Sequence, residues 1–264
     1  MDFGLKGKTA VVTGSTAGIG FGIALVLARE GANVVVNGRT SARVESALQK
    51  MRAQVPSADI VGVAADLGTK EGVTSFVKKV PQADVLVNNL GIFEVKPFLE
   101  IPDEDWQRFF EVNVLSGVRL TRHYLPGMLR KNWGRVIFIS SESGQQIPAE
   151  MVHYGMTKTA QIAIARGVAE SVAGSGVTVN SVLVGPTASE GAGQFIDTFA
   201  KEQGITKAEF EKQFFKNIRP SSLLKRFETT EEVAAVVAFL AGNQSITING
   251  AAVRADGGVV RSIL

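Results

Sequence analysis

The chain has 264 residues, of which 45% are hydrophobic and 20% are charged, so it is long enough to bury a full core. Its net charge of +3 comes with no block of Lys and Arg, which argues against a nucleic-acid partner, and zero cysteines with only two histidines exclude disulfides and a cysteine nucleophile and predict no metal site. The chain shows no apolar signal segment and no apolar run near the roughly 18 residues of a membrane span, so we expect a cytoplasmic protein without a membrane partner.

Strand-like and helix-like segments alternate along the chain, and this alternation predicts one α/β domain over residues 1–264. The first strand, residues 9–13, runs into a glycine-rich turn that is followed by a helix over residues 21–29. Glycines let the backbone approach a ligand closely, and the free N–H groups at the start of a helix attract phosphate. We therefore predict a cradle for a dinucleotide pyrophosphate, built by Gly14, Ser15, Thr16, Gly18, Ile19 and Gly20.

The end of the second strand, residues 33–37, bears on the choice of cofactor. An acidic side chain there would bind the adenosine ribose of NAD, whereas a basic one accommodates the additional phosphate of NADP. The chain has Arg39 and no acid in this stretch, so the sequence favours NADP(H) over NAD(H). The alternative is that Arg39 opens the next helix and points into water.

The third strand, residues 60–65, and the fourth, residues 84–87, end in further candidates for ligand binding. Parallel strands place their carboxyl ends at one edge of the sheet, and ligands bind at that edge. The candidates at these two ends are Asp66, Leu67, Asn89 and Gly91. Asp66 could equally be a turn or cap residue.

A long helical pattern covers residues 103–131. Gly117 and Pro126 interrupt it and should bend or shorten the helix. Asn113 also lies inside the pattern, and asparagine is a poor helix former, so its side chain should have a specific role. From the residues alone, Asn113 is a buried polar residue whose side chain hydrogen-bonds its own backbone.

The residues most suggestive of catalysis follow the fifth strand, residues 134–140. Ser141 stands at its carboxyl end, and Tyr154 and Lys158 lie four residues apart in a helix predicted over residues 151–173. Residues at i and i+4 share a helix face, and an ammonium beside a phenol lowers the pKa of the phenol. Tyr154 could then act as a general acid or base near neutral pH. The alternative is a turn serine and a chance Tyr–Lys pair.

The helix over residues 151–173 is apolar on most sides, which predicts burial and, with the long helix before it, a subunit interface in a homodimer or homotetramer. His153 precedes Tyr154 but points about 100° away from it around the helix. We therefore expect a structural role for His153.

The sixth strand, residues 177–184, leads into a loop that contains Gly185, Thr187 and Ser189. Residues 190–226 then interrupt the α/β pattern and are the expected substrate-covering insertion. A helix over residues 230–241 and a strand over residues 251–254 complete the fold.

The insertion carries phenylalanines in pairs at i and i+4, namely Phe195 with Phe199 and Phe210 with Phe214. Such pairs could form an apolar wall, which predicts an apolar carbonyl substrate. The alternative is that these rings form the core of the insertion itself.

Together these residues resemble the short-chain dehydrogenase/reductase family, and within it the 3-oxoacyl-[acyl-carrier-protein] reductases. The resemblance covers residues 8–258 and rests on Thr13-Gly14-x-x-x-Gly18-x-Gly20, Asn88-Asn89-Leu90-Gly91, Asn113, Ser141 and Tyr154-x-x-x-Lys158. It implies a Rossmann-type, doubly wound parallel sheet in a three-layer α/β/α sandwich, a nicotinamide cofactor, and an enzyme that interconverts a carbonyl and a secondary alcohol. Leu90 and Val184 depart from the family's usual alanine and proline.

The resemblance also implies the role of each catalytic residue. Tyr154 would give or take the proton on the substrate oxygen, and Ser141 would hydrogen-bond that oxygen. Lys158 would lower the pKa of Tyr154 and bind the nicotinamide ribose, so Tyr154 and Lys158 also belong to the cofactor site. Asn113 would hold a water that links Lys158 to solvent.

The remaining residues would bind the cofactor in the resemblance. Asp66 and Leu67 would contact the adenine, and Gly91, beside Asn89, would leave room for the adenosine. The loop with Gly185, Thr187 and Ser189 would hold the nicotinamide carboxamide.

Two rival functions remain at this point. Enoyl reductases of the same fold separate the tyrosine and the lysine more widely than Tyr154 and Lys158. A non-catalytic redox sensor or interaction protein that binds the nicotinamide nucleotide would not need Ser141.

Overall fold

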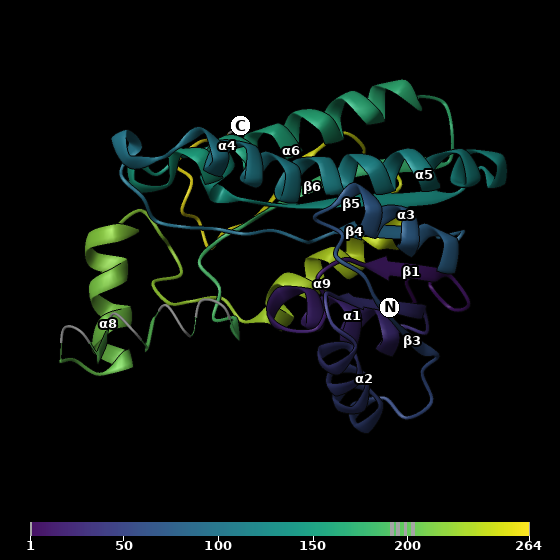
Figure 1. Ribbon diagram of the computed structural model, residues 1–264, viewed down its shortest axis with the longest axis horizontal. Coiled ribbons are helices and arrows are strands. Elements are labelled where there is room, and N and C mark those ends of the chain that lie inside the picture. The colour runs from purple at the N-terminus through teal and green to yellow at the C-terminus, as the bar shows by residue number, and fades with distance from the viewer. Residues whose placement is uncertain (1, 191–192, 194–195, 198–199, 202–203, 264) are drawn as a thin grey trace.

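One parallel sheet dominates the computed structural model, which describes residues 2–190, 193, 196–197, 200–201 and 204–263. The described residues form seven strands in the order β3-β2-β1-β4-β5-β6-β7, and each neighbouring pair is parallel (Figure 1). The strands are β1 (Thr9–Val12), β2 (Asn33–Gly38), β3 (Ile60–Ala64), β4 (Val85–Asn88), β5 (Gly134–Ser141), β6 (Val177–Val184) and β7 (Ala252–Ala255). The chain winds outward from β1 to β3 and then from β4 to β7, so the doubly wound Rossmann-type sheet is confirmed.

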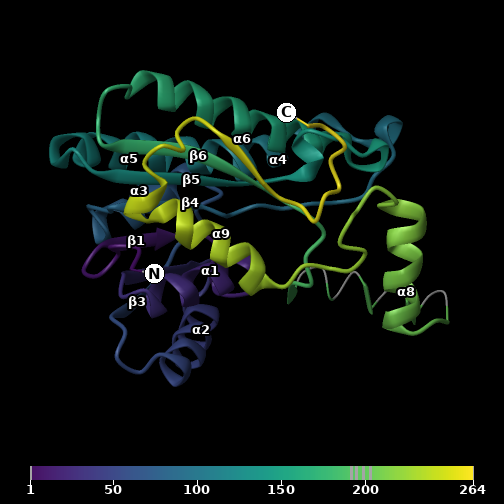
Figure 2. The ribbon, with the colours of Figure 1, turned by 180° about the vertical axis from the view of Figure 1, so that it is seen from behind.

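Helices cover both faces of the sheet, as Figures 1 and 2 show. They are α1 (Gly18–Arg29), α2 (Ser41–Gln54), α3 (Lys70–Lys79), α4 (Asp103–Phe110), α5 (Ser116–Lys131), α6 (Val152–Ser171), α8 (Lys207–Gln213) and α9 (Thr230–Ala241). Successive strand residues point to opposite faces, so Val12 packs with α1, α2 and α9 whereas Val11 packs with α3, α5 and α6. The three-layer sandwich is therefore confirmed.

The order of the strands creates the crevice in which a ligand can lie. Strand β1 pairs with β2 on one side and with β4 on the other, although β2 and β3 separate β1 from β4 in the sequence. The connections that leave the carboxyl ends of β1 and β4 therefore diverge to opposite faces of the sheet. Such a switch point is where open α/β sheets bind ligands.

The long helical pattern is broken at a different place from the one predicted. A π-helical turn, η2 (Glu111–Leu115), separates α4 from α5, and α5 continues past both Gly117 and Pro126. Asn113 lies in this wide turn, and its main-chain carbonyl accepts a hydrogen bond from the side chain of Gln161 on α6. The break thus frees a backbone group for a tertiary contact, which is a common use of π-helical turns at functional sites.

Residues 204–228, here named the α8 segment, lie beside the main body of the fold in both views (Figures 1 and 2). The segment contains α8 and a π-helical turn, η5 (Phe214–Ile218). Its base is closed by an isolated parallel bridge between Thr187 and Glu228. The bridge joins the α8 segment to the loop that follows β6.

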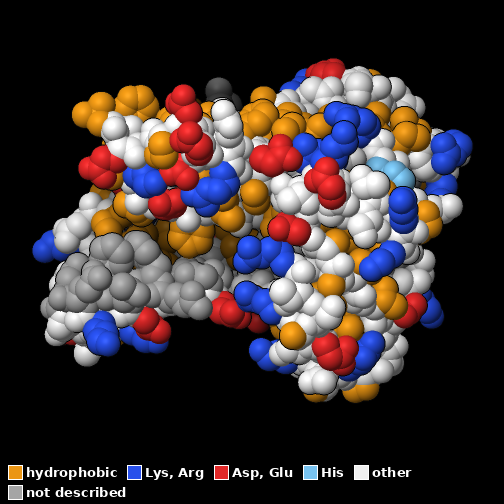
Figure 3. Space-filling view, viewed as in Figure 1, with side chains coloured by type: hydrophobic (Ala, Val, Ile, Leu, Met, Phe, Trp, Pro, Cys, Tyr) orange, Lys and Arg blue, Asp and Glu red, His pale blue; other side chains and the backbone are white. Residues whose placement is uncertain are grey.

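The described part of the chain contains neither a candidate membrane span nor a candidate metal site. No helix in it is both long and apolar enough to cross a membrane. Nor do its His, Asp and Glu side chains form a group of three or more that could hold a metal ion. On the face shown in Figure 3, Lys and Arg side chains are interspersed with Asp and Glu and form no continuous basic field.

Candidate active site

The four residues with expected catalytic roles come together at the carboxyl end of β5. Ser141 is the last residue of β5 and hydrogen-bonds the hydroxyl of Tyr154 on α6. The ammonium of Lys158, also on α6, lies 5.5 Å from the centre of the Tyr154 ring. A Cβ on Gly91 would lie 3.5 Å from both the Lys158 Nζ and the Asn113 Oδ1, so Gly91 closes the space between these two side chains.

Lys158 is buried behind Tyr154. Its ammonium donates to the main-chain carbonyl of Ile139 across 2.9 Å and to the Oε1 of Gln161 across 3.2 Å. Burial lowers the pKa of Lys158 to about 8, because the charged form loses its water shell. Lys158 can therefore change its protonation state close to neutral pH.

Tyr154 differs from the expectation in the direction of its pKa shift. Burial raises the pKa of Tyr154, and the negative charge of Glu142 raises it further. The hydrogen bond with Ser141 and the charge of Arg219 act in the opposite direction. In the protein alone the expected lowering by Lys158 is not found, because desolvation of the phenolate outweighs the nearby positive charges.

Asn113 is held on both sides of its amide. Its Oδ1 accepts from the backbone N–H of Ile92 at 2.8 Å, and its Nδ2 donates to the Ile92 carbonyl at 3.0 Å and to the Thr157 hydroxyl at 3.0 Å. The side chain thus bonds the backbone of Ile92, 21 residues away, instead of its own backbone as expected from the residues alone, although its burial is as expected.

Gln161 is a site residue that the sequence analysis missed. Its Nε2 donates to the Asn113 carbonyl across 2.6 Å while its Oε1 accepts from Lys158, so it links the two residues through one side chain. The available signal was a glutamine three residues after Lys158 on the same face of an otherwise apolar helix.

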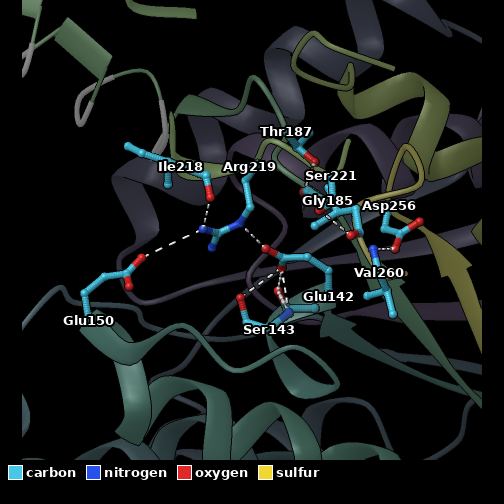
Figure 4. Close-up of polar contacts among 12 residues, drawn as sticks. Glu142, Ser143, Glu150, Gly185, Thr187, Ile218, Arg219, Ser221, Asp256 and Val260 are labelled. Atoms are coloured by element: carbon cyan, nitrogen blue, oxygen red, sulfur yellow. Dashed lines mark hydrogen bonds and ion pairs between the residues drawn. The ribbon is translucent and has the colours of Figure 1, made fainter. Parts of the chain in front are cut away.

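A second missed feature is a buried ion pair beside Ser141 (Figure 4). The Oε1 of Glu142 accepts from the Nε of Arg219 across 2.9 Å, and the side chains are only 6% and 13% exposed. The acid directly after Ser141 was visible in the sequence. Arg219 was not recognisable, because 77 residues separate the two partners.

His153 has the structural character expected of it. The ring is fully buried, packs 4.1 Å from the ring centre of Phe109, and lies edge-on to Trp106. Neither ring nitrogen has a hydrogen-bond partner among the described residues. The burial lowers the pKa of His153 and so favours the neutral ring.

The glycine-rich turn after β1 has the shape of a phosphate cradle. Gly14 and Gly18 have φ values of +60° and +57°, a conformation that glycine adopts without strain. A Cβ on Gly20 would lie 2.5 Å from the Gly14 carbonyl oxygen, so only glycine fits there. Asn89 supports the turn by donating to the carbonyl of Gly14 across 3.2 Å. Thr16 and Ile19 are partly exposed in the same turn.

Ser15 does not offer its polar groups to a ligand, contrary to the expectation. Its hydroxyl donates to the Val12 carbonyl at 2.6 Å and accepts from the Asn37 N–H at 2.9 Å, while its own N–H donates to the Asn37 carbonyl at 2.8 Å. Ser15 thus binds the turn to β2 and shapes the cradle from within.

Arg39 follows the last residue of β2 and is exposed. Its guanidinium has no hydrogen bond or ion pair within the described residues, whereas the neighbouring Arg43 pairs with Glu190 at 3.3 Å. A Cβ on Gly38 would lie 2.4 Å from the methyl group of Thr16, so an acidic side chain at Gly38 would need that threonine to move. The free cation at this strand end fits a phosphate group.

The candidates after β3 and β4 differ in what their side chains do. The Oδ1 of Asp66 accepts from the N–H of Gly68 at 3.0 Å, so the interpretation as a turn residue is confirmed. Leu67 is buried in the core between the sheet and α3. Leu90 also packs against this core, so its side chain is directed into the fold.

The loop after β6 reaches back to the glycine-rich turn. A Cβ on Gly18 would lie 3.3 Å from the Cβ of Ser189. Thr187 is buried and its hydroxyl donates to the Gly185 carbonyl across 3.0 Å. The loop therefore lies against the glycine-rich turn, and both stand at the same carboxyl edge of the sheet as Ser141.

The expected apolar wall is absent from the described residues of the α8 segment. Phe210, Phe214 and Phe215 are buried in a cluster with Phe227, so they form the core of the segment itself. Phe195 and Phe199 lie outside the described residues. The apolar side chain that does face the site is Phe93, whose ring meets the Tyr154 ring edge-on at 6.4 Å and is half-exposed.

Comparisons with known proteins agree with this geometry. A sequence profile described as short chain dehydrogenase matches residues 8–198. The chain is 48% identical over 263 residues to the uncharacterized oxidoreductase YvaG of Bacillus subtilis, with 100% of both chains covered. It is 32% identical to the 3-oxoacyl-[acyl-carrier-protein] reductase FabG of Aquifex aeolicus, with 98% of this chain and 100% of the relative covered. The solved structure of L-sorbose reductase from Gluconobacter frateurii, complexed with NADPH and L-sorbose, matches with a TM-score of 0.94 at 30% identity and 100% coverage of both chains.

Proposed function

The chain belongs to the short-chain dehydrogenase/reductase family and is an oxidoreductase acting on CH–OH groups, and we propose that it interconverts a carbonyl and a secondary alcohol with NADP(H), using Tyr154 as general acid and base. The observation that carries the proposal is the convergence of Ser141, Tyr154 and Lys158 at the crevice beside the glycine-rich turn. A binding protein would need the turn but not this group of side chains.

The protein's part in the reaction is the handling of one proton. A bound nicotinamide supplies or accepts the hydride at the substrate carbon. Tyr154 gives a proton to the substrate oxygen in reduction and takes it back in oxidation, while Ser141 hydrogen-bonds the same oxygen. The raised pKa of Tyr154 keeps its phenol protonated at neutral pH, which is the form that carbonyl reduction requires.

Lys158 then serves as the next proton carrier. Its pKa of about 8 lets it release or take up a proton near neutral pH. Gln161 accepts from Lys158 and donates to the Asn113 carbonyl, and a water bound at this network would connect Lys158 to solvent. The same lysine lies beside Gly91, so Gly91 would lie next to the nicotinamide ribose instead of the adenosine expected from the resemblance.

The preference for NADP(H) over NAD(H) rests on Arg39. Its exposed guanidinium stands at the end of β2 without a partner in the described residues, and the L-sorbose reductase structure with a similar fold contains NADPH. Replacing Arg39 with aspartate should raise the Kd of NADPH by at least about tenfold and leave that of NADH nearly unchanged, because one phosphate contact is worth roughly 1.5–3 kcal/mol. The matched control is Arg43→Gln, whose cation is already paired with Glu190.

The cradle, the loop with Gly185, Thr187 and Ser189, and the backbone of Asp66, Leu67, Asn89 and Gly91 would hold the rest of the dinucleotide. The contacts of the turn with Ser189 and Asn89 support this assignment. Ser15 would contribute through the shape of the turn alone.

The decisive experiment is the consumption of NADPH and NADH against a panel of carbonyls, followed by the loss of nicotinamide absorbance. The panel contains L-sorbose, a 3-oxoacyl thioester, and simple aliphatic and aromatic ketones. We expect turnover that disappears in Tyr154→Phe while the variant still binds NADPH. Turnover that survives in Tyr154→Phe would refute the assigned acid and base, and binding of both nucleotides without turnover of any carbonyl would favour the redox-sensor function.

We also propose that the protein is a homodimer or homotetramer that uses α5 and α6. Ala163 and Gly167 on α6 are exposed in the single chain, and such small residues allow another helix to approach closely. Light scattering after size-exclusion chromatography should give a mass of two or four chains, and a monomer mass at micromolar concentration would contradict the proposal.

A further inference from the structure

The hydroxyl of Ser141 is engaged by its own neighbour in the chain. It donates to the Oε2 of Glu142 in a short hydrogen bond and accepts from the N–H of Ser143 at 3.1 Å. A serine hydroxyl has one proton and two lone pairs. The hydrogen bond with the Tyr154 hydroxyl takes the second lone pair, so Ser141 has no proton left for a substrate oxygen.

The carboxylate of Glu142 is fixed in this position because donors bind both of its oxygens. Its Oε2 also accepts from the N–H and the hydroxyl of Ser143, at 2.7 and 2.9 Å, and its Oε1 accepts from Arg219. Only 6% of the side chain is exposed, so water does not weaken these bonds.

Arg219 comes from the α8 segment and not from the sheet. It directly follows the π-helical turn η5, and its N–H donates to the Phe214 carbonyl at 2.9 Å, which fixes it to the aromatic core of the segment. Its Nη1 lies 3.8 Å from Glu150, whose side chain is 46% exposed, so Glu142 is its principal partner (Figure 4). The α8 segment thereby contacts the carboxylate that holds the Ser141 proton.

We propose that Glu142 and Arg219 are positioning residues for the reaction proposed above: Glu142 holds the proton of the Ser141 hydroxyl, and Arg219 weakens that hold by sharing the carboxylate. The inference rests on the proposed roles of Ser141 and Tyr154. To hydrogen-bond a substrate oxygen, Ser141 must turn its proton away from Glu142. An arginine on the opposite oxygen draws charge from the carboxylate and makes this turn easier.

The pair acts on Tyr154 as well. After burial, the charge of Glu142 is the next cause that raises the pKa of Tyr154, whereas the hydrogen bond with Ser141 and the charge of Arg219 lower it. Ser141 can donate to the Tyr154 phenolate only when its proton turns away from Glu142. The other charged groups near the pair are Lys158, behind the Tyr154 ring, and Glu150 and Glu228, which face Arg219 and Glu142 respectively.

The first test needs no substrate, because the chain has only two tyrosines, Tyr124 and Tyr154. Phenolate absorbance near 295 nm is measured at one alkaline pH at which circular dichroism shows a folded chain, and the signal of Tyr154→Phe is subtracted. We expect Glu142→Gln to give more phenolate than the unaltered protein and Arg219→Gln to give less. Each shift should correspond to about one pH unit, or roughly tenfold in the ionised fraction.

The second test uses the carbonyl that the protein turns over and its alcohol. The pH at which kcat/KM for oxidation by NADP⁺ is half-maximal should fall in Glu142→Gln, rise in Arg219→Gln and return toward the original value in the double variant. Arg219→Lys keeps the positive charge, so its half-maximal pH should rise less than that of Arg219→Gln. Glu150→Gln is the matched control, because it removes the other carboxylate near Arg219 without touching Ser141, and its profile should stay unchanged.

Equal phenolate signals in folded Glu142→Gln, Arg219→Gln and unaltered protein would overturn the inference. So would identical shifts in Glu150→Gln, since the effect would then be a general one of surface charge. If only this inference fails, turnover still requires Tyr154 but does not change in the Glu142 and Arg219 variants. If the proposed function fails, Tyr154→Phe remains active.

Discussion

The side-chain amide of Gln161 donates to the main-chain carbonyl of Asn113 across 2.6 Å, and this bond fastens the π-helical turn between α4 and α5 to the catalytic helix α6. The oxygen of the same amide accepts a hydrogen bond from the ammonium of Lys158. One glutamine therefore sets the position of both the lysine and the turn.

Replacement of Gln161 should affect stability and activity together. Gln161→Met removes the donor to the buried Asn113 carbonyl, so the free energy of unfolding should fall by about 1–3 kcal/mol in a urea titration. The kcat should fall as well, because Lys158 loses an acceptor. Gln161→Glu is the informative control, since its carboxylate still receives Lys158 while the donor to Asn113 is lost. Full stability in both variants would show that the bond to Asn113 contributes nothing.

The pH dependence of stability should reveal the buried ammonium of Lys158. Its pKa in the folded protein, about 8, lies below the value of 10.5 for the free side chain. Below pH 8 the folded chain must therefore carry a desolvated charge, and above pH 10.5 it carries none in either state. Lys158→Met removes this charge, so it should stabilise the protein more at pH 7 than at pH 10.5. The difference between the two stabilising effects should be about 3 kcal/mol in the free energy of unfolding. A difference that does not change with pH would mean that Lys158 titrates normally.

Glu228 should show the opposite sign with pH. Burial, followed by the charges of Asp256 and Glu232, raises the pKa of Glu228 to about 8, and its Oε2 has no partner among the described residues. The folded state then binds one more proton than the unfolded state between about pH 4.5 and 8, so Glu228 costs stability as the pH rises through this window. Glu228→Gln should stabilise the protein by a few kcal/mol, on the order of 3, at pH 8 and by little at pH 4.5.

The control for Glu228 is Glu231→Gln, which removes an exposed carboxylate from the first turn of α9. Thermal unfolding of both variants from pH 4.5 to pH 8.5 separates the two cases. If Glu228→Gln stabilised the protein equally at pH 4.5 and at pH 8.5, the pKa of Glu228 would not be raised.

The glycine-rich turn should tolerate no side chain at Gly20. In Gly20→Ala the new Cβ would lie 2.4 Å from the Nδ2 of Asn89 and 2.5 Å from the Gly14 carbonyl oxygen, so the cradle must open. We expect the Kd of NADPH, measured by nucleotide fluorescence, to rise more than about tenfold, which corresponds to 1.4 kcal/mol.

Gly167 on α6 supplies the matched control for Gly20. It is exposed, and a Cβ there would meet nothing within 4 Å. Gly167→Ala should leave NADPH binding unchanged and stabilise a single chain by roughly 0.5–1 kcal/mol, because alanine loses less backbone entropy in a helix. If Gly20→Ala and Gly167→Ala weakened NADPH binding equally, the loss in Gly20→Ala could not be assigned to the cradle.

Local patterns in the sequence determined the elements of the sheet and most of its ligand-binding edge. Strand-to-glycine transitions such as the one before Gly14, and the helical spacing of Tyr154 and Lys158, depend on backbone geometry over a few residues. Because parallel strands share one carboxyl edge, these local features already implied that Ser141 and the glycine-rich turn lie near each other.

Tertiary packing alone decided which groups share a proton or a charge. The helix breaks at Glu111–Leu115, where Asn113 contacts Gln161, although Gly117 and Pro126 had indicated a later break. The aromatic rings of the α8 segment could have formed a wall or a core, and packing made them a core.

The pairing of Glu142 with Arg219 shows the reason most clearly. Their side chains are 77 residues apart in the chain, and nothing in either local sequence selects the other. The raised pKa of Tyr154 follows first from burial and then from the charge of Glu142, and both depend on which surfaces the fold removes from water. Periodicity and spacing act over one or two helical turns, whereas desolvation and charge act between whatever groups the folded chain brings together.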